Sequence, residues 1–283
     1  MTFLERILVH PIKSLDATSV SSARIVENGG LEWDRRYAIV DEDGNFVNGK
    51  REPRIHRLRS SFDLERETVA LWEYGASGEG TEVNAPDTSW LDDQTFHLEV
   101  DRAELDGWLS AFFDEPVALV RDDEGGFPDD TDASGPTVIA TATLEAVASW
   151  FDAGAGLDVE GIRRRLRPNL EVGGVVPFWE DRLYDRPGRV VPFDVGQVHL
   201  RGVNPCQRCV VPTRDPDTGE PTEGFQRRFL ERREATLPTW ANRAWFDHYF
   251  RLMVNTSVPE SSWGERLAVG DDLVVSEPID ESD

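Results

Sequence analysis

The two cysteines of this 283-residue chain are the residues best suited to chemistry, and they lie close together as Cys206 and Cys209. They form a C-x-x-C pattern in which Arg208 directly precedes the second cysteine. A thiolate beside a guanidinium has a lowered pKa, and the thiolate is the form that binds metals or attacks electrophiles. The pattern therefore predicts a reactive site at these cysteines, in a loop between strands.

Several kinds of cysteine site can be compared with this pattern. A structural zinc site needs four protein ligands, but the chain has no further cysteine and its 5 histidines are scattered. A thioredoxin-like motif would open a helix, whereas Val210, Val211 and Pro212 follow here. A disulfide between the two cysteines is the structural alternative. The reactive alternative is a soft thiolate site that binds a metal which brings most of its own ligands.

The cysteine stretch resembles the MOSC domain family. Cys206, Arg208 and Cys209, followed by Asp-Pro-Asp-Thr-Gly at 215–219, are similar to the cysteine motif of MOSC proteins typified by the mitochondrial amidoxime-reducing component and its bacterial relatives. In that family the second cysteine binds the molybdenum of a pterin cofactor (Mo-molybdopterin). The resemblance thus assigns the metal-binding and catalytic role to Cys209, and a place in the cofactor site to Arg208.

Three further motifs resemble this family and occur in its order along the chain. The segment Pro11-Ile-Lys-Ser14 is similar to P-x-K-S, the pair Asp34-Arg35 to D-R, and Arg167-Pro-Asn169 to R-P-N. Without the resemblance, Lys13 could be a surface lysine in a bend, and the R-P-N arginine could form a plain salt bridge. With it, the implied cofactor-binding residues are Lys13, Ser14, Arg35, Arg167 and Asn169.

Thr143 is a further candidate for cofactor binding. It follows a predicted buried strand at 137–140 and is expected to open a helix. A helix N-terminus offers free N–H groups and partial positive charge to a phosphate. The family commonly has serine here, and the structural alternative is a plain N-cap.

The composition excludes several classes of protein. At 39% hydrophobic residues the chain can form one large or two ordinary domains, and no apolar run approaches the ~20 residues of a membrane span. The N-terminus enters a strand without a signal peptide, and two cysteines suit a reducing compartment. These features predict a cytoplasmic protein.

The charge balance is strongly acidic. The formal net charge is −24, from 54 acidic and 30 basic residues, and Lys13 and Lys50 are the only lysines. Nucleic acid and anionic membranes are poor partners for such a surface. An acidic surface depleted of lysine is typical of proteins from a cytoplasm with multimolar salt, so we hypothesise a halophilic source.

The hydrophobic pattern predicts an α+β fold in two domains. Alternation and turn residues indicate a domain of short antiparallel strands in residues 1–121, which includes a helix at 101–113 capped by Asp101 with Leu105, Leu109 and Phe112 inward. The polar stretch 122–135 predicts the boundary. The resemblance implies that residues 1–121 are a MOSC N-terminal β domain and that residues 122–283 form a MOSC β-barrel domain with peripheral helices. One helix carries Phe225 and Phe229 on its buried face and its arginines outward.

The resemblance implies a molybdenum cofactor-dependent oxidoreductase that reduces N-hydroxylated compounds by oxygen-atom transfer. Two cysteines cannot hold a four-cysteine iron–sulfur cluster, so a separate ferredoxin or flavoprotein reductase would supply electrons. The alternative is a cofactor or sulfur carrier with a persulfide on Cys209, since MOSC domains also resemble the C-terminal part of molybdenum cofactor sulfurases. For the MOSC family as a whole, pyridoxal phosphate binding is a further association.

Overall fold

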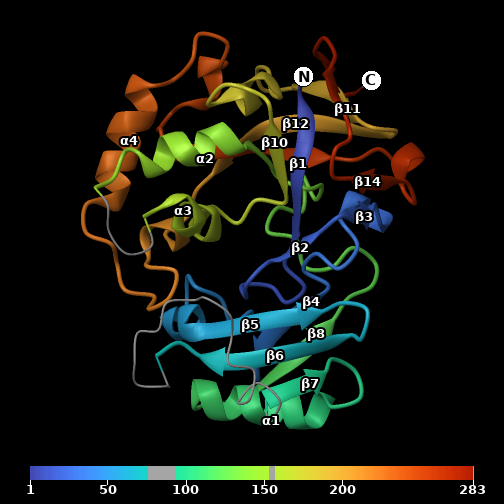
Figure 1. Ribbon diagram of the computed structural model, residues 1–283, viewed down its shortest axis with the longest axis vertical. Coiled ribbons are helices and arrows are strands. Elements are labelled where there is room, and N and C mark those ends of the chain that lie inside the picture. Colours follow the sequence, from blue (N-terminus) through green and yellow to red (C-terminus); the bar gives the residue numbers. More distant parts are fainter. Residues whose placement is uncertain (76–93, 153–156, 283) are drawn as a thin grey trace.

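The computed structural model describes residues 1–75, 94–152 and 157–282. These residues form sixteen strands and four α-helices, which confirms the predicted α+β class. The elements are arranged in two bodies (Figure 1): a smaller body with β4–β8 and α1, and a larger body that contains both chain ends. No helix in the described ranges is long and apolar enough to cross a membrane.

The larger body is built on a nine-stranded sheet in the order β15-β11-β12-β13-β9-β10-β1-β2, with β16 paired to β11. Within the described residues only β9 and β10 of this sheet pair in parallel. The isolated bridge between Phe3 and Asp272 brings β1 beside the residues that precede β15, so the sheet curls back toward itself. The strand bounds are Phe3–Val9 (β1), Thr18–Val20 (β2), Val138–Ala140 (β9), Leu170–Gly173 (β10), Arg189–Val195 (β11), Val198–Gln207 (β12), Arg251–Ser257 (β13), Leu273–Val275 (β15) and Ile279–Asp280 (β16).

Strand β12 continues to Gln207 and so includes Cys206. Its pairing with β13 shifts register between Gly202 and Asn204 and again between Pro205 and Gln207. Such bulges let a strand continue past a proline, which cannot donate to the ladder. The expectation that both thiols lie in a loop is therefore wrong for Cys206, whereas Cys209 does follow the strand.

Three helices pack against the larger sheet and share a hydrophobic core with it (Figure 1). They are α2 (Thr141–Ala148), α3 (Val159–Leu166) and α4 (Phe225–Ala235). In α4, Phe225 and Phe229 are buried as predicted. The expectation that all its arginines face outward is wrong, because Arg233 is fully buried and donates to Asp181 at 2.7 Å. A buried guanidinium of this kind needs a carboxylate partner, which the pattern of the helix alone does not reveal.

The smaller body has its own core around helix α1 (Arg102–Phe113). Leu105 and Leu109 are buried as predicted, but Phe113 rather than Phe112 completes the inward face. Asp101 makes no side-chain cap; its carboxylate instead accepts from His97 N at 2.8 Å. The strands of this body are β4 (Tyr37–Asp41), β5 (Leu58–Asp63), β6 (Thr68–Glu73), β7 (Thr95–His97) and β8 (Val117–Arg121).

The chain passes between the two bodies twice, once before β4 and once after β8. Strands β1 and β2 belong to the large sheet, and β3 (Ser22–Arg24) pairs with β14 (Arg266–Ala268) near the C-terminus. The chain returns from β8 to β9 through residues 122–137, which include the predicted boundary. A short helical turn, η2 (Pro53–Arg57), precedes β5 and lies against the turn at 215–219. The approach is so close at Gly219 that a Cβ there would collide with the carbonyl oxygen of Pro53.

Candidate functional site

A cavity of about 990 Å³ is lined by residues from both bodies. Its size is that of a small-molecule or cofactor site. Seven of the eight site residues predicted from the sequence line it: Lys13, Ser14, Arg35, Arg167, Asn169, Arg208 and Cys209. Residues that are almost 200 positions apart in the chain are thus brought together in one place.

The lining of this cavity is basic, in contrast to the rest of the chain. Twelve Lys or Arg residues and five Asp or Glu residues contribute to it, although the formal net charge of the chain is −24. The only two lysines of the sequence, Lys13 and Lys50, both line it. A surplus of fixed cations in a concave site raises the local concentration of anionic ligands. The cavity is therefore suited to an anionic small molecule.

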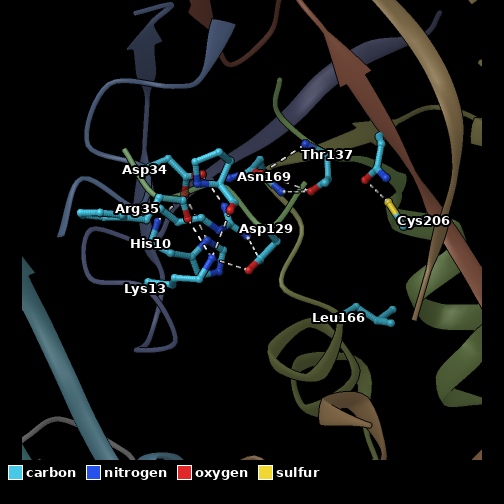
Figure 2. A network of polar contacts seen from close by, with 12 residues as sticks. His10, Lys13, Asp34, Arg35, Asp129, Thr137, Leu166, Asn169 and Cys206 are labelled. Carbon is cyan, nitrogen blue, oxygen red and sulfur yellow. Dashed lines mark hydrogen bonds and ion pairs between the residues drawn. The ribbon is translucent and has the colours of Figure 1, made fainter. Parts of the chain in front are cut away.

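Lys13 and Arg35 form one cationic cluster, which Figure 2 shows together with their acidic partner. The Lys13 ammonium donates to Asp129 Oδ1 at 2.6 Å and to the carbonyl oxygen of Phe127 at 2.8 Å. Arg35 Nη2 lies 3.3 Å from Asp129 Oδ2, and its Nη1 pairs with Asp34. We call this group the Lys13–Arg35–Asp129 cluster. Both predicted cations are present, and in this structure both are neutralised by carboxylates.

The electrostatics of the cluster follow from burial and from these partners. Burial lowers the pKa of Lys13, although Asp129 opposes the effect. Burial alone would raise the pKa of Asp34, but Arg35 and His10 outweigh it and lower that pKa to about 2. Burial and Arg167 lower the pKa of His10 to about 4. At neutral pH the cluster thus holds Asp34 as a carboxylate beside a neutral imidazole.

Three of the predicted site residues in the cavity have a left-handed backbone. The φ angles of Ser14, Arg35 and Arg167 are 76°, 52° and 58°. Residues other than glycine rarely adopt this conformation, which costs free energy and is found preferentially at functional sites. Hydrogen bonds from the surrounding backbone hold it in place: Arg35 N donates to His10 O, and Arg167 N donates to Arg163 O, both at 2.8 Å. The left-handed backbone at these three residues lowers the stability of the folded state while it sets the direction of their side chains.

Arg167 ends helix α3 and differs from Lys13 and Arg35 because its guanidinium has no carboxylate partner among the described residues. Its Nη2 is buried without a hydrogen-bond partner there. Burial and the nearby Arg35 lower its pKa to about 10, which leaves it charged at neutral pH. A buried, charged donor without a partner is costly, so this position calls for an anion.

Asn169 lines the cavity but also connects three strands. Its Nδ2 donates to Leu8 O at 3.1 Å, and its Oδ1 accepts from both the backbone N–H and the hydroxyl of Thr137 at 3.2 Å. In the view of Figure 2, Asn169 and Thr137 lie between the Lys13–Arg35–Asp129 cluster and Cys206. The R-P-N motif thus fixes the cavity wall where β1, β9 and β10 meet.

The two thiols have different surroundings. Both are free, so the disulfide alternative is not what the structure contains. Cys206 is 4% exposed, its Sγ donates to Asn255 Oδ1 at 2.6 Å, and burial raises its pKa to about 12. Cys209 is half-buried and lines the cavity. The lowered pKa expected for a thiol of this motif is therefore wrong for Cys206, and the thiol suited to bind a metal is that of Cys209.

Thr143 is the predicted site residue that the structure does not bring to the cavity. Helix α2 begins at Thr141 rather than at Thr143, with Ala140 as its N-cap. The fully buried hydroxyl of Thr143 donates to Glu180 Oε2 at 2.9 Å and accepts from Phe178 N at 2.6 Å. Its role in the fold is to hold the start of α2 against the segment around Glu180, so the helix-opening expectation is wrong.

Some residues that line the cavity were not predicted from the sequence. Asp129 lies in the stretch predicted as a linker, where only Gly125 and Gly126 hint at a close approach: a Cβ at Gly126 would lie 2.6 Å from the carbonyl oxygen of Arg35. His56 and Arg214 also line the cavity and belong to no motif that the sequence analysis identified. The linker is thus part of the site.

The residues present fit the cofactor that the resemblance implies. No group of three or more His, Cys, Asp or Glu residues in the described ranges could hold a metal ion by itself. A metal that arrives with its own ligands needs a single protein thiolate, which Cys209 can supply. The unpartnered Nη2 of Arg167 and the basic lining can receive an anionic group of the same ligand.

Comparisons with known proteins agree with this geometry. Residues 1–116 match the family model of the MOSC N-terminal beta barrel domain, and residues 137–274 match that of the MOSC domain. The chain is 30% identical over 261 residues to the mitochondrial amidoxime-reducing component 1 of Danio rerio, covering 82% of this chain and 77% of that protein. The Homo sapiens protein of that name is 25% identical over 232 residues, which cover 75% of this chain and 66% of that protein. The molybdenum cofactor sulfurase of Homo sapiens is 23% identical over 261 residues, which cover 81% of this chain but only 28% of the sulfurase.

Proposed function

Because this chain belongs to the family of MOSC proteins that includes the amidoxime-reducing components, we propose that it binds a molybdenum cofactor and reduces N-hydroxylated compounds. The observation that carries the proposal is that Cys209 shares one basic cavity with Lys13, Arg35 and the unpartnered Arg167. A thiolate beside buried cations is the combination that an anionic metal cofactor requires.

The residues of the cavity would have distinct roles toward this cofactor. Cys209 would supply the thiolate ligand, while Arg167 and Arg208 would pair with anionic groups of the cofactor. Lys13, Ser14 and Arg35 would position it from the smaller-body side of the cavity. Cys206, which is buried and donates to Asn255, would stay a thiol and pack the wall. When bound, the cofactor supplies the oxygen-atom transfer chemistry.

The reaction needs reducing equivalents that the chain cannot store. Conversion of an N-hydroxylated compound to the parent amine or amidine consumes two electrons and two protons and releases water. The chain has no cysteines beyond Cys206 and Cys209 to hold an iron–sulfur cluster. A separate electron-donor protein, a ferredoxin or a flavoprotein reductase, would therefore deliver the electrons.

The test is the metal content and activity of protein expressed in a molybdate-replete host that makes the cofactor. We expect stoichiometric molybdenum, a pterin, and reduction of an amidoxime such as benzamidoxime with a chemical electron donor. Cys209→Ser should lose both molybdenum and activity. Cys206→Ser is the matched control and should keep most of the metal.

A sulfur or cofactor carrier is the second candidate, and the similarity to a molybdenum cofactor sulfurase favours it. A carrier would hold a persulfide on Cys209 and hand sulfur onward. Metal-free protein with cyanide-releasable sulfur that depends on Cys209 would support the carrier and reject the reductase. Molybdenum-containing protein without any N-hydroxy reductase activity would support a cofactor carrier instead.

A further inference from the structure

The five acidic residues that line the cavity differ in what neutralises them. Four of them form an ion pair with a lysine or an arginine: Asp16, Asp34, Asp129 and Glu160. The fifth is Asp130, which forms no ion pair with any residue that the structure describes; its hydrogen-bond donors there are neutral. Asp130 therefore brings an unbalanced carboxylate to a lining that is otherwise basic.

The carboxylate of Asp130 has acceptor capacity left for a ligand. Its Oδ2 accepts from Asn255 Nδ2, and its Oδ1 accepts from the backbone N–H of Asp132, both at 3.1 Å. An ionised carboxylate has about four lone-pair acceptor sites and can accept two parallel hydrogen bonds from one planar cation. One acceptor site on each oxygen thus remains beyond the bonds to described residues.

The side chain that holds Asp130 is fully bonded itself. Asn255 Nδ2 donates to Asp130 and also to Asn204 Oδ1 at 3.1 Å, so both of its hydrogens are used. Asn255 Oδ1 accepts from Cys206 Sγ at 2.6 Å, the contact that the dashed line at Cys206 marks in Figure 2. Rotating the amide by 180° would place its oxygen against the acceptor oxygens of Asp130 and Asn204. The amide is therefore held in one orientation, and all four residues line the cavity.

The thiol of Cys206 sets the orientation of this amide. Burial raises the pKa of Cys206 to about 12, so the thiol keeps the proton that it donates to Asn255. The pairing of β12 with β13 brings the two segments together, with Asn204 opposite Asn255. Cys206 thus acts on the cavity through Asn255, whereas Cys209 lines it directly.

We propose that Asp130 is a specificity-determining residue, which pairs with a cationic nitrogen group of the substrate, and that Asn255 and Cys206 position it. A planar amidinium or guanidinium group fits, because its two N–H donors can each meet one carboxylate oxygen. The basic lining repels such a cation elsewhere, so Asp130 decides where that end of the substrate lies. Calling this ligand the substrate rests on the proposed function, but the pairing itself depends only on the chain's own residues.

Binding of benzamidine and benzamide to the cofactor-free protein tests the pairing. The two molecules have nearly the same shape, but benzamidine is a cation at neutral pH. Isothermal titration at constant ionic strength should show that the wild type binds benzamidine about tenfold more tightly. Asp130→Asn should bind the two about equally. Asp132→Asn removes an exposed acid of the same segment, leaves its backbone donor in place, and should keep the preference.

Two substitutions of Cys206 test the positioning role. Cys206→Ser keeps a donor for Asn255 and should keep the preference for benzamidine. Cys206→Ala removes the donor, and the preference should fall by about threefold. Equal preference in the two variants would mean that Cys206 only fills the wall and does not position Asp130.

The proposal is overturned when the wild type does not prefer benzamidine, or when folded Asp130→Asn prefers it as strongly as the wild type does. Should Asp130→Asn fail to fold, Asn255→Ala removes the donor that holds the carboxylate and should lower the preference instead; an unchanged preference would again overturn the proposal.

The outcome can be separated from that of the proposed function. Protein that never acquires molybdenum, yet prefers benzamidine through Asp130, would reject the proposed function and leave the pairing standing. Molybdenum-containing protein that reduces benzamidoxime without a preference that depends on Asp130 would support the proposed function and reject the role of Asp130.

Discussion

The Lys13 ammonium and the Asp129 carboxylate lie 2.6 Å apart, although 116 positions separate them in the chain. Lys13 also donates to the carbonyl oxygens of Phe127 and Pro128, and Phe127 N donates to Arg35 O at 2.8 Å. Residues 127–129, which lie between β8 and β9, are thus held in place by hydrogen bonds and ion pairs to Lys13 and Arg35. A ligand that pairs with Lys13 would therefore compete with Asp129 for its ammonium group.

Asp129→Asn should therefore destabilise the cofactor-free protein. The change leaves Lys13 and Arg35 without their shared carboxylate, and because the Asp129 side chain is 66% exposed we expect a loss of only about 1 kcal/mol in the free energy of unfolding. Urea unfolding measures it. Asp132→Asn, which alters an exposed acid of the same segment, should leave the value unchanged; equal effects of both variants would contradict the account.

The two cysteines should react at different rates with an alkylating reagent. Cys206 is buried, donates to Asn255, and has a pKa raised to about 12, so little of it is thiolate at pH 8. Cys209 is half-buried in the cavity wall. Iodoacetamide followed by peptide mass spectrometry should find Cys209 modified first. Faster modification of Cys206 in the native protein would contradict this difference.

A four-membered ion-pair group joins the two bodies at the rim of the cavity. Arg59 donates to Asp16 at 2.8 Å and to Asp217 at 2.7 Å, and Arg164 donates to Asp217 at 2.9 Å. Asp217 belongs to the Asp-Pro-Asp-Thr-Gly motif, which therefore docks one body on the other. Their side chains are 20–22% exposed.

A double-mutant cycle of Arg59→Gln and Asp217→Asn should give a coupling free energy of about 1–2 kcal/mol, because the group is a partly buried network. The exposed pair Arg228–Asp152 serves as the control and should give less than about 0.5 kcal/mol. Equal coupling in the two pairs would show that the ion-pair group does not hold the bodies together.

The stability of the protein should fall on mild acidification, partly through His56. Its pKa is lowered to about 4 in the folded protein, by burial first and by Arg167 next, whereas a histidine in the unfolded chain titrates near 6.5. Between these values the unfolded state binds the proton and the folded state does not, so stability decreases as the pH falls from 6.5 toward 4.

For His56 the contribution is at most about 1.4 kcal/mol for each pH unit in this window. His56→Gln should therefore lose less stability than the wild type between pH 7 and pH 5, as measured by urea unfolding at both values. An identical pH dependence of the two proteins would mean that His56 is not held neutral.

The charge of the chain predicts how its stability depends on salt. With a net charge of −24, self-repulsion opposes the folded state at low ionic strength, and added salt screens it. We expect the melting temperature to rise steeply across a KCl series into the molar range. A flat response would reject the hypothesis of a halophilic source.

Much of the fold and of the site follows from local patterns in the sequence. Alternation predicted short strands in residues 1–121, where the structure has strands such as Phe3–Val9 and Thr68–Glu73, and the helix predicted at 101–113 is α1, Arg102–Phe113. The resemblance of the motifs to a known family implied one site for Lys13, Arg35 and Arg167, and the structure has all three in one cavity. The strands and the helix depend on local periodicity, whereas the grouping of these three residues depended on the resemblance.

The features that sequence reasoning missed depend on contacts between distant segments. Asp129 pairs with a lysine 116 positions away, and Arg233 with Asp181 in another element. Cys206 is drawn into β12 by bulges that depend on the register with β13. The position of Thr143 is set by its hydrogen bonds to Glu180 and Phe178, which no local pattern in the sequence indicates.

The most direct test of the central claim is the molybdenum content of the wild type, Cys206→Ser and Cys209→Ser, all purified from the same cofactor-competent host and measured per mole of folded protein. The account predicts about one molybdenum for the wild type, a similar value for Cys206→Ser, and almost none for Cys209→Ser. Wild-type levels of molybdenum in Cys209→Ser, or loss of the metal in Cys206→Ser alone, would contradict it.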